Sequence, residues 1–229
     1  MRPVGILGGM GPAATILLMQ KVMEAVPARD DAEHVPLIVH QNPQVPSRIA
    51  ALIERTGPDP GPVLARMARD MEAAGAQALA MPCNTAHACA GAIRAATDLP
   101  FLDMPELTAE RLAASGARRI GMLASPATRI ADVFAAPLET RGLTPLFLDD
   151  EAPLLDLIRA VKAGADRATL GPRLHAQGAM LAARGADHLL VACTELSLMT
   201  DALPPDMPRT DSLDCLTGAI VAFARDRAE

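Results

Sequence analysis

The chain has 229 residues, of which 50% are hydrophobic, and it carries a formal net charge of −6 at pH 7. This length and composition suffice to bury the core of one large domain or two small ones. Its only aromatic residues are four Phe, and no block of Lys or Arg stands out, so neither nucleic acid nor an anionic membrane surface is expected as a partner.

Short apolar segments alternate with longer stretches of helical spacing along the whole chain. Strands are predicted at residues 4–7, 37–40, 78–81 and 101–102, and again at 120–123, 146–148, 188–192 and near 210. Helical spacing appears between them and after the last, as at residues 12–26, 63–74, 107–114, 167–184 and 215–227. This alternation predicts an α/β fold with parallel sheets and helices on both faces.

The first apolar segment is too short for a signal peptide, and no run of 18 apolar residues predicts a membrane span. The chain contains four cysteines and no C-x-x-C pair. Together these features favour a cytoplasmic protein with free thiols and argue against a metal site.

The two halves of the chain resemble each other. Four segments recur in the same order at offsets of 116, 109, 110 and 108 residues, which is hard to attribute to chance. We expect two similar flavodoxin-like lobes, each with a four-stranded parallel sheet, related by a pseudo-two-fold axis. The first is predicted at residues 1–98, with residues 212–229 packed back on it, and the second at residues 99–211. The matching segments are 2–7 with 118–123, 36–39 with 145–148, 75–84 with 185–194, and 100–103 with 208–211.

Cys83 and Cys193 occupy equivalent positions, each just after the third predicted strand of its lobe. Ligands bind outside the carboxyl ends of parallel strands, so the two thiols are expected on opposite sides of one small molecule. Such a pair suits inversion at a tetrahedral carbon, because a base removes a proton from one face and an acid returns one to the other. A cysteine without such a partner is usually a small buried hydrophobe, and we interpret Cys89 and Cys215 in that way.

Helices are expected to begin directly after both cysteines, at Asn84-Thr85 and Thr194-Glu195. Their backbone N–H groups and helix dipoles would stabilise a thiolate or a substrate carboxylate. His87 either orients the site or packs in a helix, and these alternatives stay open.

Three motifs resemble the signatures of the aspartate/glutamate racemases. They are Gly-Gly-Met-Gly-Pro-Ala-Ala-Thr at residues 8–15, Pro-Cys-Asn-Thr-Ala-His at 82–87 and Ala-Cys-Thr-Glu-Leu at 192–196. The resemblance spans essentially the whole chain and is strongest to aspartate racemase. It implies a homodimeric isomerase that needs neither pyridoxal phosphate nor a metal, with Cys83 and Cys193 as the catalytic residues. The substrate-binding positions it implies are Met10, Arg48, Asn84, Thr85, Lys162, Thr194 and Glu195.

The two cations fit an acidic amino acid as substrate, because the distal carboxylate would take Arg48 in a bidentate pose with support from Lys162. We therefore predict interconversion of L- and D-aspartate, with glutamate as a second substrate. Ser47, Ile49 and the loop at residues 124–129 depart from the family pattern at the rim of the pocket, so these departures bear on the identity of the substrate rather than on the type of reaction. The turn-rich segment at residues 56–62 is either a mobile lid over the substrate or an ordinary surface connection.

Other functions remain open at the level of sequence. A hydantoin racemase also uses two cysteines, but its substrate offers no target for a pair of cations. Maleate isomerases and arylmalonate decarboxylases, which belong to the same superfamily, need only one cysteine. A non-catalytic dicarboxylate-binding protein would keep Arg48 and Lys162 but would not need paired thiols.

Overall fold

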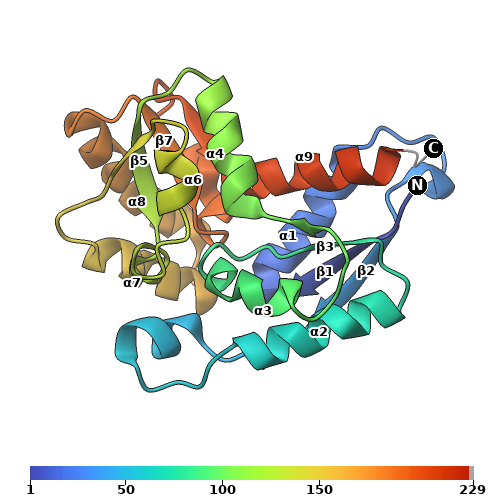
Figure 1. Cartoon of the computed structure of the whole chain (residues 1–229). Helices are drawn as coiled ribbons and strands as arrows, with labels where there is room; N and C mark the ends of the chain where they lie inside the picture. Colours follow the sequence, from blue (N-terminus) through green and yellow to red (C-terminus); the bar gives the residue numbers. More distant parts are fainter. Residues whose placement is uncertain (227–229) are drawn as a thin grey trace.

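A computed structural model describes residues 1–226 and contains two parallel sheets of four strands each. The strands of the first sheet lie in the order β2-β1-β3-β4, and those of the second in the equivalent order β6-β5-β7-β8. This confirms the predicted α/β architecture of two similar sheets flanked by helices (Figure 1). The strands are β1 (Val4–Gly8), β2 (Leu37–Gln41), β3 (Ala78–Ala80), β4 (Phe101–Leu102), β5 (Arg119–Ala124), β6 (Thr144–Leu146), β7 (His188–Ala192) and β8 (Arg209–Asp211).

The strand registers reproduce the sequence repeat. Val4 of β1 is paired with Ala78 of β3, and the equivalent Ile120 of β5 is paired with His188 of β7. The pairing of β3 with β4 matches that of β7 with β8 in the same way. The exception is β6, which begins two residues before the predicted strand at 146–148 and is shifted by one residue relative to β2.

Helices cover both faces of each sheet. α1 (Pro12–Glu24) and α9 (Ser212–Arg225) pack on one face of the first sheet, and α2 (Gly61–Ala73) and α3 (Ala90–Arg94) pack on the other. α7 (Ala152–Lys162) and α8 (Arg167–Ala183) cover one face of the second sheet, and α4 (Met104–Ala114) and α6 (Ala135–Glu139) cover the other. The predicted end of the last helix, residue 227, lies outside the described residues.

The remaining short elements lie in the loops. They are α5 (Pro126–Ile130), the 3₁₀ helices η1 (Asp31–Glu33), η3 (Thr85–Cys89) and η4 (Leu196–Ala202), and the π-helical turn η2 (Ala50–Glu54). No helix in the described part of the chain is both long enough and apolar enough to span a membrane.

The amphipathic pattern explains how the helices pack. In α2 the buried residues Leu64, Met67, Ala68 and Met71 recur at the spacing of one helix face. In the strand β1, Val4 and Ile6 face α1 and α9, while Leu7 faces α2. Each sheet is therefore buried on both faces, as parallel sheets generally are.

The two helices that follow the last strand of each sheet are exchanged between the sheets. α4 leaves β4 of the first sheet, yet its residues Ala109 and Leu112 pack against the second. α9 leaves β8 of the second sheet, yet Leu216 and Ile220 pack against the first. Figure 1 shows α9 in red extending from the second lobe beside α1.

We propose two lobes on this basis, residues 1–102 with 212–226, and residues 103–211. The predicted packing of the terminal segment on the first lobe fits this division. The predicted boundary after residue 98 differs, because it assigned β4 to the second lobe and β4 pairs with β3 in the first sheet.

Two glycines test the equivalence of the lobes. A Cβ on Gly5 would lie 3.0 Å from atoms of Ala76, Leu79 and Met71, which is tighter than most real Cβ contacts. A Cβ on Gly121 would lie 2.9–3.0 Å from the equivalent Leu189, Ala186 and Leu181. At both positions a side chain larger than glycine would force its neighbours to shift.

Replacing Gly121 by alanine is therefore expected to lower the free energy of unfolding by about 1–3 kcal/mol through overpacking. The matched control is Gly218→Ala in α9, where a Cβ meets nothing within 4 Å. This change should raise the stability by about 0.5–1 kcal/mol. Urea unfolding monitored by circular dichroism measures both changes, and equal effects of the two variants would contradict the close packing at Gly121.

Candidate active site

All nine residues that the sequence singled out line one small cavity between the two lobes. The cavity has a volume of about 30 Å³, which is room for one or two water molecules. It lies at the carboxyl ends of the strands, as expected for parallel sheets. The predicted residues are Met10, Arg48, Cys83, Asn84, Thr85, Lys162, Cys193, Thr194 and Glu195.

Cys83 follows β3 and is held in place by its backbone. Its N–H donates to the Met81 carbonyl at 2.8 Å, and its own carbonyl lies 2.9 Å from Nδ1 of His87. Nε2 of His87 accepts a hydrogen bond from the Met104 N–H at 3.2 Å, so Nδ1 carries the proton and donates to Cys83. Burial lowers the pKa of His87, which keeps the ring neutral. His87 therefore fixes the Cys83 loop against α4.

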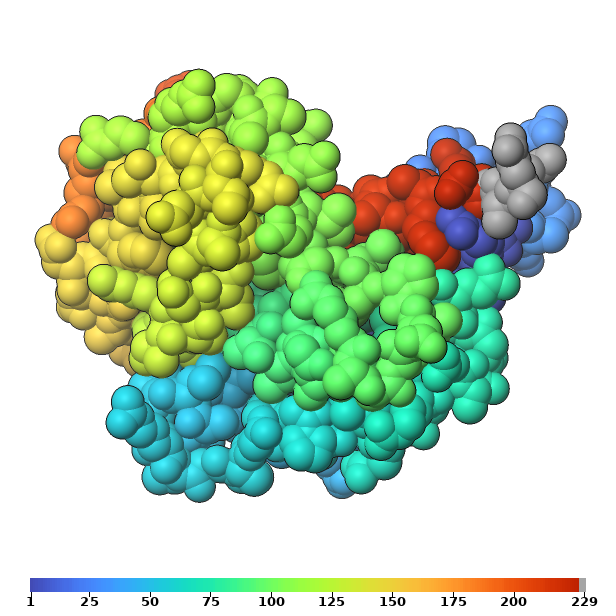
Figure 2. Space-filling model, in the orientation of Figure 1, coloured from blue at the N-terminus to red at the C-terminus, as the bar shows by residue number. Residues whose placement is uncertain are grey.

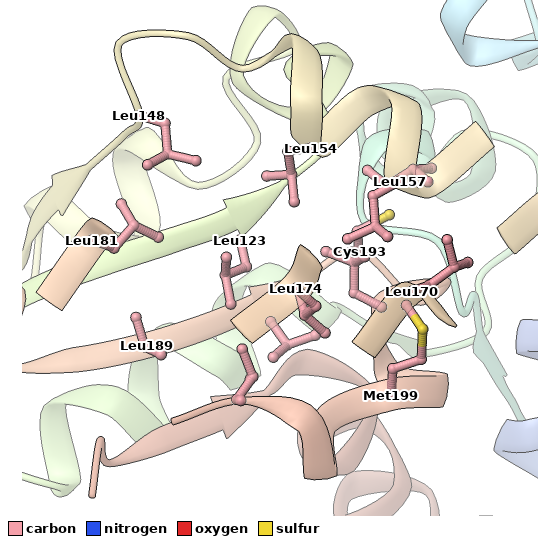
Figure 3. Packing of buried hydrophobic residues seen from close by; sticks show 14 of the residues in the cluster. Leu123, Leu148, Leu154, Leu157, Leu170, Leu174, Leu181, Leu189, Cys193 and Met199 are labelled. Atoms are coloured by element: carbon pink, nitrogen blue, oxygen red, sulfur yellow. The ribbon is translucent and has the colours of Figure 1, made fainter. Parts of the chain in front are cut away.

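Cys193 follows β7 and is 7% exposed. Figure 3 shows it at the same end of the apolar cluster as Leu157, Leu170 and Met199. Its Sγ donates a hydrogen bond to Oε2 of Glu195 at 3.1 Å. Burial and the Glu195 carboxylate raise the pKa of the Cys193 thiol well above its ordinary value, although Lys162 opposes them.

Lys162, at the end of α7, is paired with Glu195. Its Nζ lies 3.2 Å from Oε1 of Glu195. Burial lowers the pKa of Lys162, but Glu195, Cys193 and Cys83 outweigh burial, so the net shift is upward and the ammonium stays charged. Lys162 therefore enters the site with its charge already balanced by a carboxylate.

Arg48 differs from Lys162 in this respect. Its Nη1 donates to the backbone carbonyls of Val45 and Pro46 at 3.3 and 2.8 Å, and within residues 1–226 its guanidinium is paired with no carboxylate. The half-buried side chain lines the cavity. Arg48 is therefore the cation that can receive a carboxylate without displacing a protein partner.

Polar side chains join the two lobes around the cavity. Thr85 and Thr128 share a hydrogen bond of 2.7 Å between their hydroxyls, and the Thr194 hydroxyl donates to the Pro82 carbonyl at 3.2 Å. Asn84 Nδ2 donates to Ser212 at 2.9 Å, but Asn84 Oδ1 is buried and accepts no hydrogen bond from the described residues. Oε1 of Glu195 likewise accepts no hydrogen bond. Nζ of Lys162 forms an ion pair with it, but the geometry is not that of a hydrogen bond.

The predicted helix starts after the two cysteines differ from the structure. The segments that follow Cys83 and Cys193 are the 3₁₀ helices η3, of 5 residues, and η4, of 7 residues. Such short turns have little dipole. The electrostatic setting of the thiols therefore comes from side chains rather than from helix ends.

Six further residues line the cavity: Ser47, Ile49, Ser125, Ala127, Ile158 and Ala192. Ser47, Ile49 and the loop at residues 124–129 are the positions where the sequence departs from the family pattern, and Ala192 begins the motif at residues 192–196. The sequence reasoning missed Ile158 of α7, because an apolar residue within a helix carries no motif.

The segment at residues 47–60 reaches across to the second lobe. The π-helical turn η2 contacts α5, and Glu54 lies 3.5 Å from Arg159 of α7 in an ion pair. Figure 2 shows this segment in light blue against the yellow-green surface of the second lobe. The turn-rich segment at residues 56–62, interpreted as either a mobile lid or an ordinary surface connection, overlaps this bridge, and both alternatives stay open.

No group of three His, Cys, Asp or Glu side chains within residues 1–226 is arranged to hold a metal ion. Each of the two equivalent lobes presents one thiol to the cavity between them. The chain belongs to the Asp/Glu/Hydantoin racemase family, whose sequence profile matches residues 7–220. The predicted family and enzyme class are thereby confirmed.

Relatives agree with this assignment over the full length. The chain is 24% identical over 227 residues to the broad specificity amino-acid racemase RacX of Bacillus subtilis, and the match covers 96% of each chain. The structure is similar to aspartate racemase of Picrophilus torridus, with a TM-score of 0.89, 27% identity and coverage of 100% of this chain and 96% of that one. The fold is also shared with glutamate racemase of Francisella tularensis, solved in complex with D-glutamate, at a TM-score of 0.67, 14% identity and coverage of 97% and 80%.

Proposed function

We propose that this racemase interconverts L- and D-aspartate, and also the enantiomers of glutamate, by proton transfer between the α-carbon and the two thiols Cys83 and Cys193. The observation that carries the proposal is the presence of both thiols, 8% and 7% exposed, on one cavity between the lobes. The similarity to the Picrophilus torridus aspartate racemase supports the choice of substrate.

The polar groups of the cavity match an amino-dicarboxylate. Arg48 is a cation without a carboxylate partner among the described residues, so it receives the distal carboxylate. The buried acceptors Asn84 Oδ1 and Glu195 Oε1 lack hydrogen-bond donors, and the substrate ammonium supplies them. A hydantoin has no carboxylate, so it would leave Arg48 without an anionic partner.

The reaction needs two proton transfers. One cysteine, as thiolate, removes the α-proton, so the Cα–H bond breaks and an S–H bond forms. The resulting carbanion is delocalised into the α-carboxylate, and the other cysteine donates its proton to the opposite face. The enzyme is left with the protonation states of the two thiols exchanged. A homodimeric assembly, a cytoplasmic location and independence of pyridoxal phosphate remain part of this proposal.

A second candidate function is racemisation of a wider range of amino acids. The relation to the broad specificity racemase RacX favours it. In that case the cavity would accept side chains without a distal carboxylate, and Arg48 would contribute little to turnover.

Proton NMR in D2O tests the proposal directly. With L- or D-aspartate, we expect the α-proton signal to disappear while the optical rotation decays to zero. Glutamate, alanine and a hydantoin, measured in parallel, rank the substrates. Binding of aspartate without loss of the α-proton signal from either enantiomer would contradict catalysis, and equal rates for aspartate and alanine would favour the broader specificity.

A further inference from the structure

The two cysteines are equivalent in position but not in their partners. The repeat that superposes Cys83 on Cys193 also superposes Thr85 on Glu195. Glu195 accepts the hydrogen bond of the Cys193 thiol, whereas the hydroxyl of Thr85 is bonded to Thr128. Within residues 1–226, Sγ of Cys83 makes no hydrogen bond and is paired with no carboxylate. Only one lobe therefore places an anion beside its thiol.

We infer that Glu195 is a positioning residue that holds the proton on Cys193, so that the free enzyme rests with Cys193 as the acid and Cys83 as the base. The inference rests on the proposed two-thiol racemisation. It assigns a role to Glu195 other than substrate binding alone.

The contacts around Glu195 support this role. The carboxylate is 7% exposed and uses Oε2 for the thiol, while Lys162 lies 3.2 Å from Oε1. Lys162 pairs with this carboxylate, and a carboxylate oxygen accepts a hydrogen bond but does not donate one. The thiol must then keep its proton to make the bond. Loss of that proton would leave a thiolate 3.1 Å from a carboxylate oxygen, an unfavourable pair of like charges.

The charged groups that face Cys193 come from four elements. Glu195 from the loop after β7 disfavours the thiolate, and Lys162 from α7 favours it. Arg48 and Cys83 complete the set of ionisable groups on the cavity. Because Glu195 lies between Lys162 and the thiol, it reduces the influence of Lys162 on Cys193 in the resting site.

The experiment measures alkylation of Cys193 by iodoacetamide between pH 6 and pH 10, with peptide mapping by mass spectrometry. In wild type, Cys83 should react faster than Cys193 at pH 7.5. Glu195→Gln keeps an acceptor for the thiol but removes the charge. In this variant the pH dependence of Cys193 alkylation should shift to lower pH by at least about one pH unit. That shift is about a tenfold rise in its thiolate fraction at pH 7.5.

Two further variants separate charge from structure. Glu195→Asp keeps the charge and should hold the Cys193 profile closer to wild type than Glu195→Gln does. Lys162→Gln removes the cation and should shift the pH dependence of Cys193 alkylation to higher pH. Cys89 and Cys215 serve as internal references in each digest, because burial raises the pKa of both thiols independently of Glu195.

An unchanged Cys193 profile in Glu195→Gln would overturn the inference, as would faster alkylation of Cys193 than of Cys83 in wild type. Circular dichroism confirms that each variant is folded. Alkylation requires no substrate, so these outcomes are independent of the NMR test of racemisation. A shifted profile without racemase activity would reject the proposed function while leaving the partnership of Glu195 and Cys193 in place.

Discussion

Replacing either Cys83 or Cys193 by alanine is expected to lower the rate of aspartate racemisation by about 10²- to 10⁴-fold, the usual contribution of a general acid or base. Each thiol faces one side of the substrate, so neither can replace the other. Each variant should still exchange the α-proton of one enantiomer with D2O, and the two variants should act on opposite enantiomers. Polarimetry follows racemisation, and proton NMR follows exchange.

Cys89→Ala and Cys215→Ala are the matched controls. Both residues are partly exposed free thiols that lie outside the cavity between the lobes. These variants should retain wild-type rates. Full racemase activity in Cys83→Ala or Cys193→Ala would contradict the mechanism with two thiols.

The second large effect is expected at Arg48. Replacement by leucine should lower kcat/KM for aspartate by about 100-fold, because a bidentate, charge-assisted pair with the distal carboxylate is lost. Arg48→Lys should recover part of this loss, since it keeps the charge but not the planar fork. Activity towards alanine should change much less, because alanine has no distal carboxylate.

Arg173→Leu provides the control for the change in net charge. Arg173 is exposed on α8 and does not line the cavity. Kinetics with aspartate, glutamate and alanine distinguish the outcomes. An equal loss for all three substrates in Arg48→Leu would show that Arg48 supports the loop rather than binds the substrate.

Most of the fold and of the set of cavity residues could be predicted, because the two halves of the sequence repeat the same order of strands and motifs. The repeat placed Cys83 and Cys193 at equivalent strand ends, and their registers confirm that equivalence. The family resemblance added Arg48 and Lys162, which come from a loop and a helix without internal symmetry.

Other features depend on tertiary contacts that no local pattern encodes. The pairing of Lys162 with Glu195 requires the end of α7 to meet the loop after β7. 3₁₀ helices, η3 and η4, follow the two cysteines in place of the expected helix starts, since Cys83 and Cys193 lie in tight turns closed by backbone hydrogen bonds. Strand β4 has only two residues, so its sheet could be assigned only from its pairing with β3.

The exchange of α4 and α9 between the lobes has a consequence for how the protein is made. The first sheet is synthesised early, but α9, the helix that packs with Ile6 and Leu18 in its core, follows the whole second lobe in the sequence. At about 5–20 residues per second, the ribosome needs roughly 5–20 s to add the second lobe before α9 emerges. During that time the nascent first lobe exposes an apolar face.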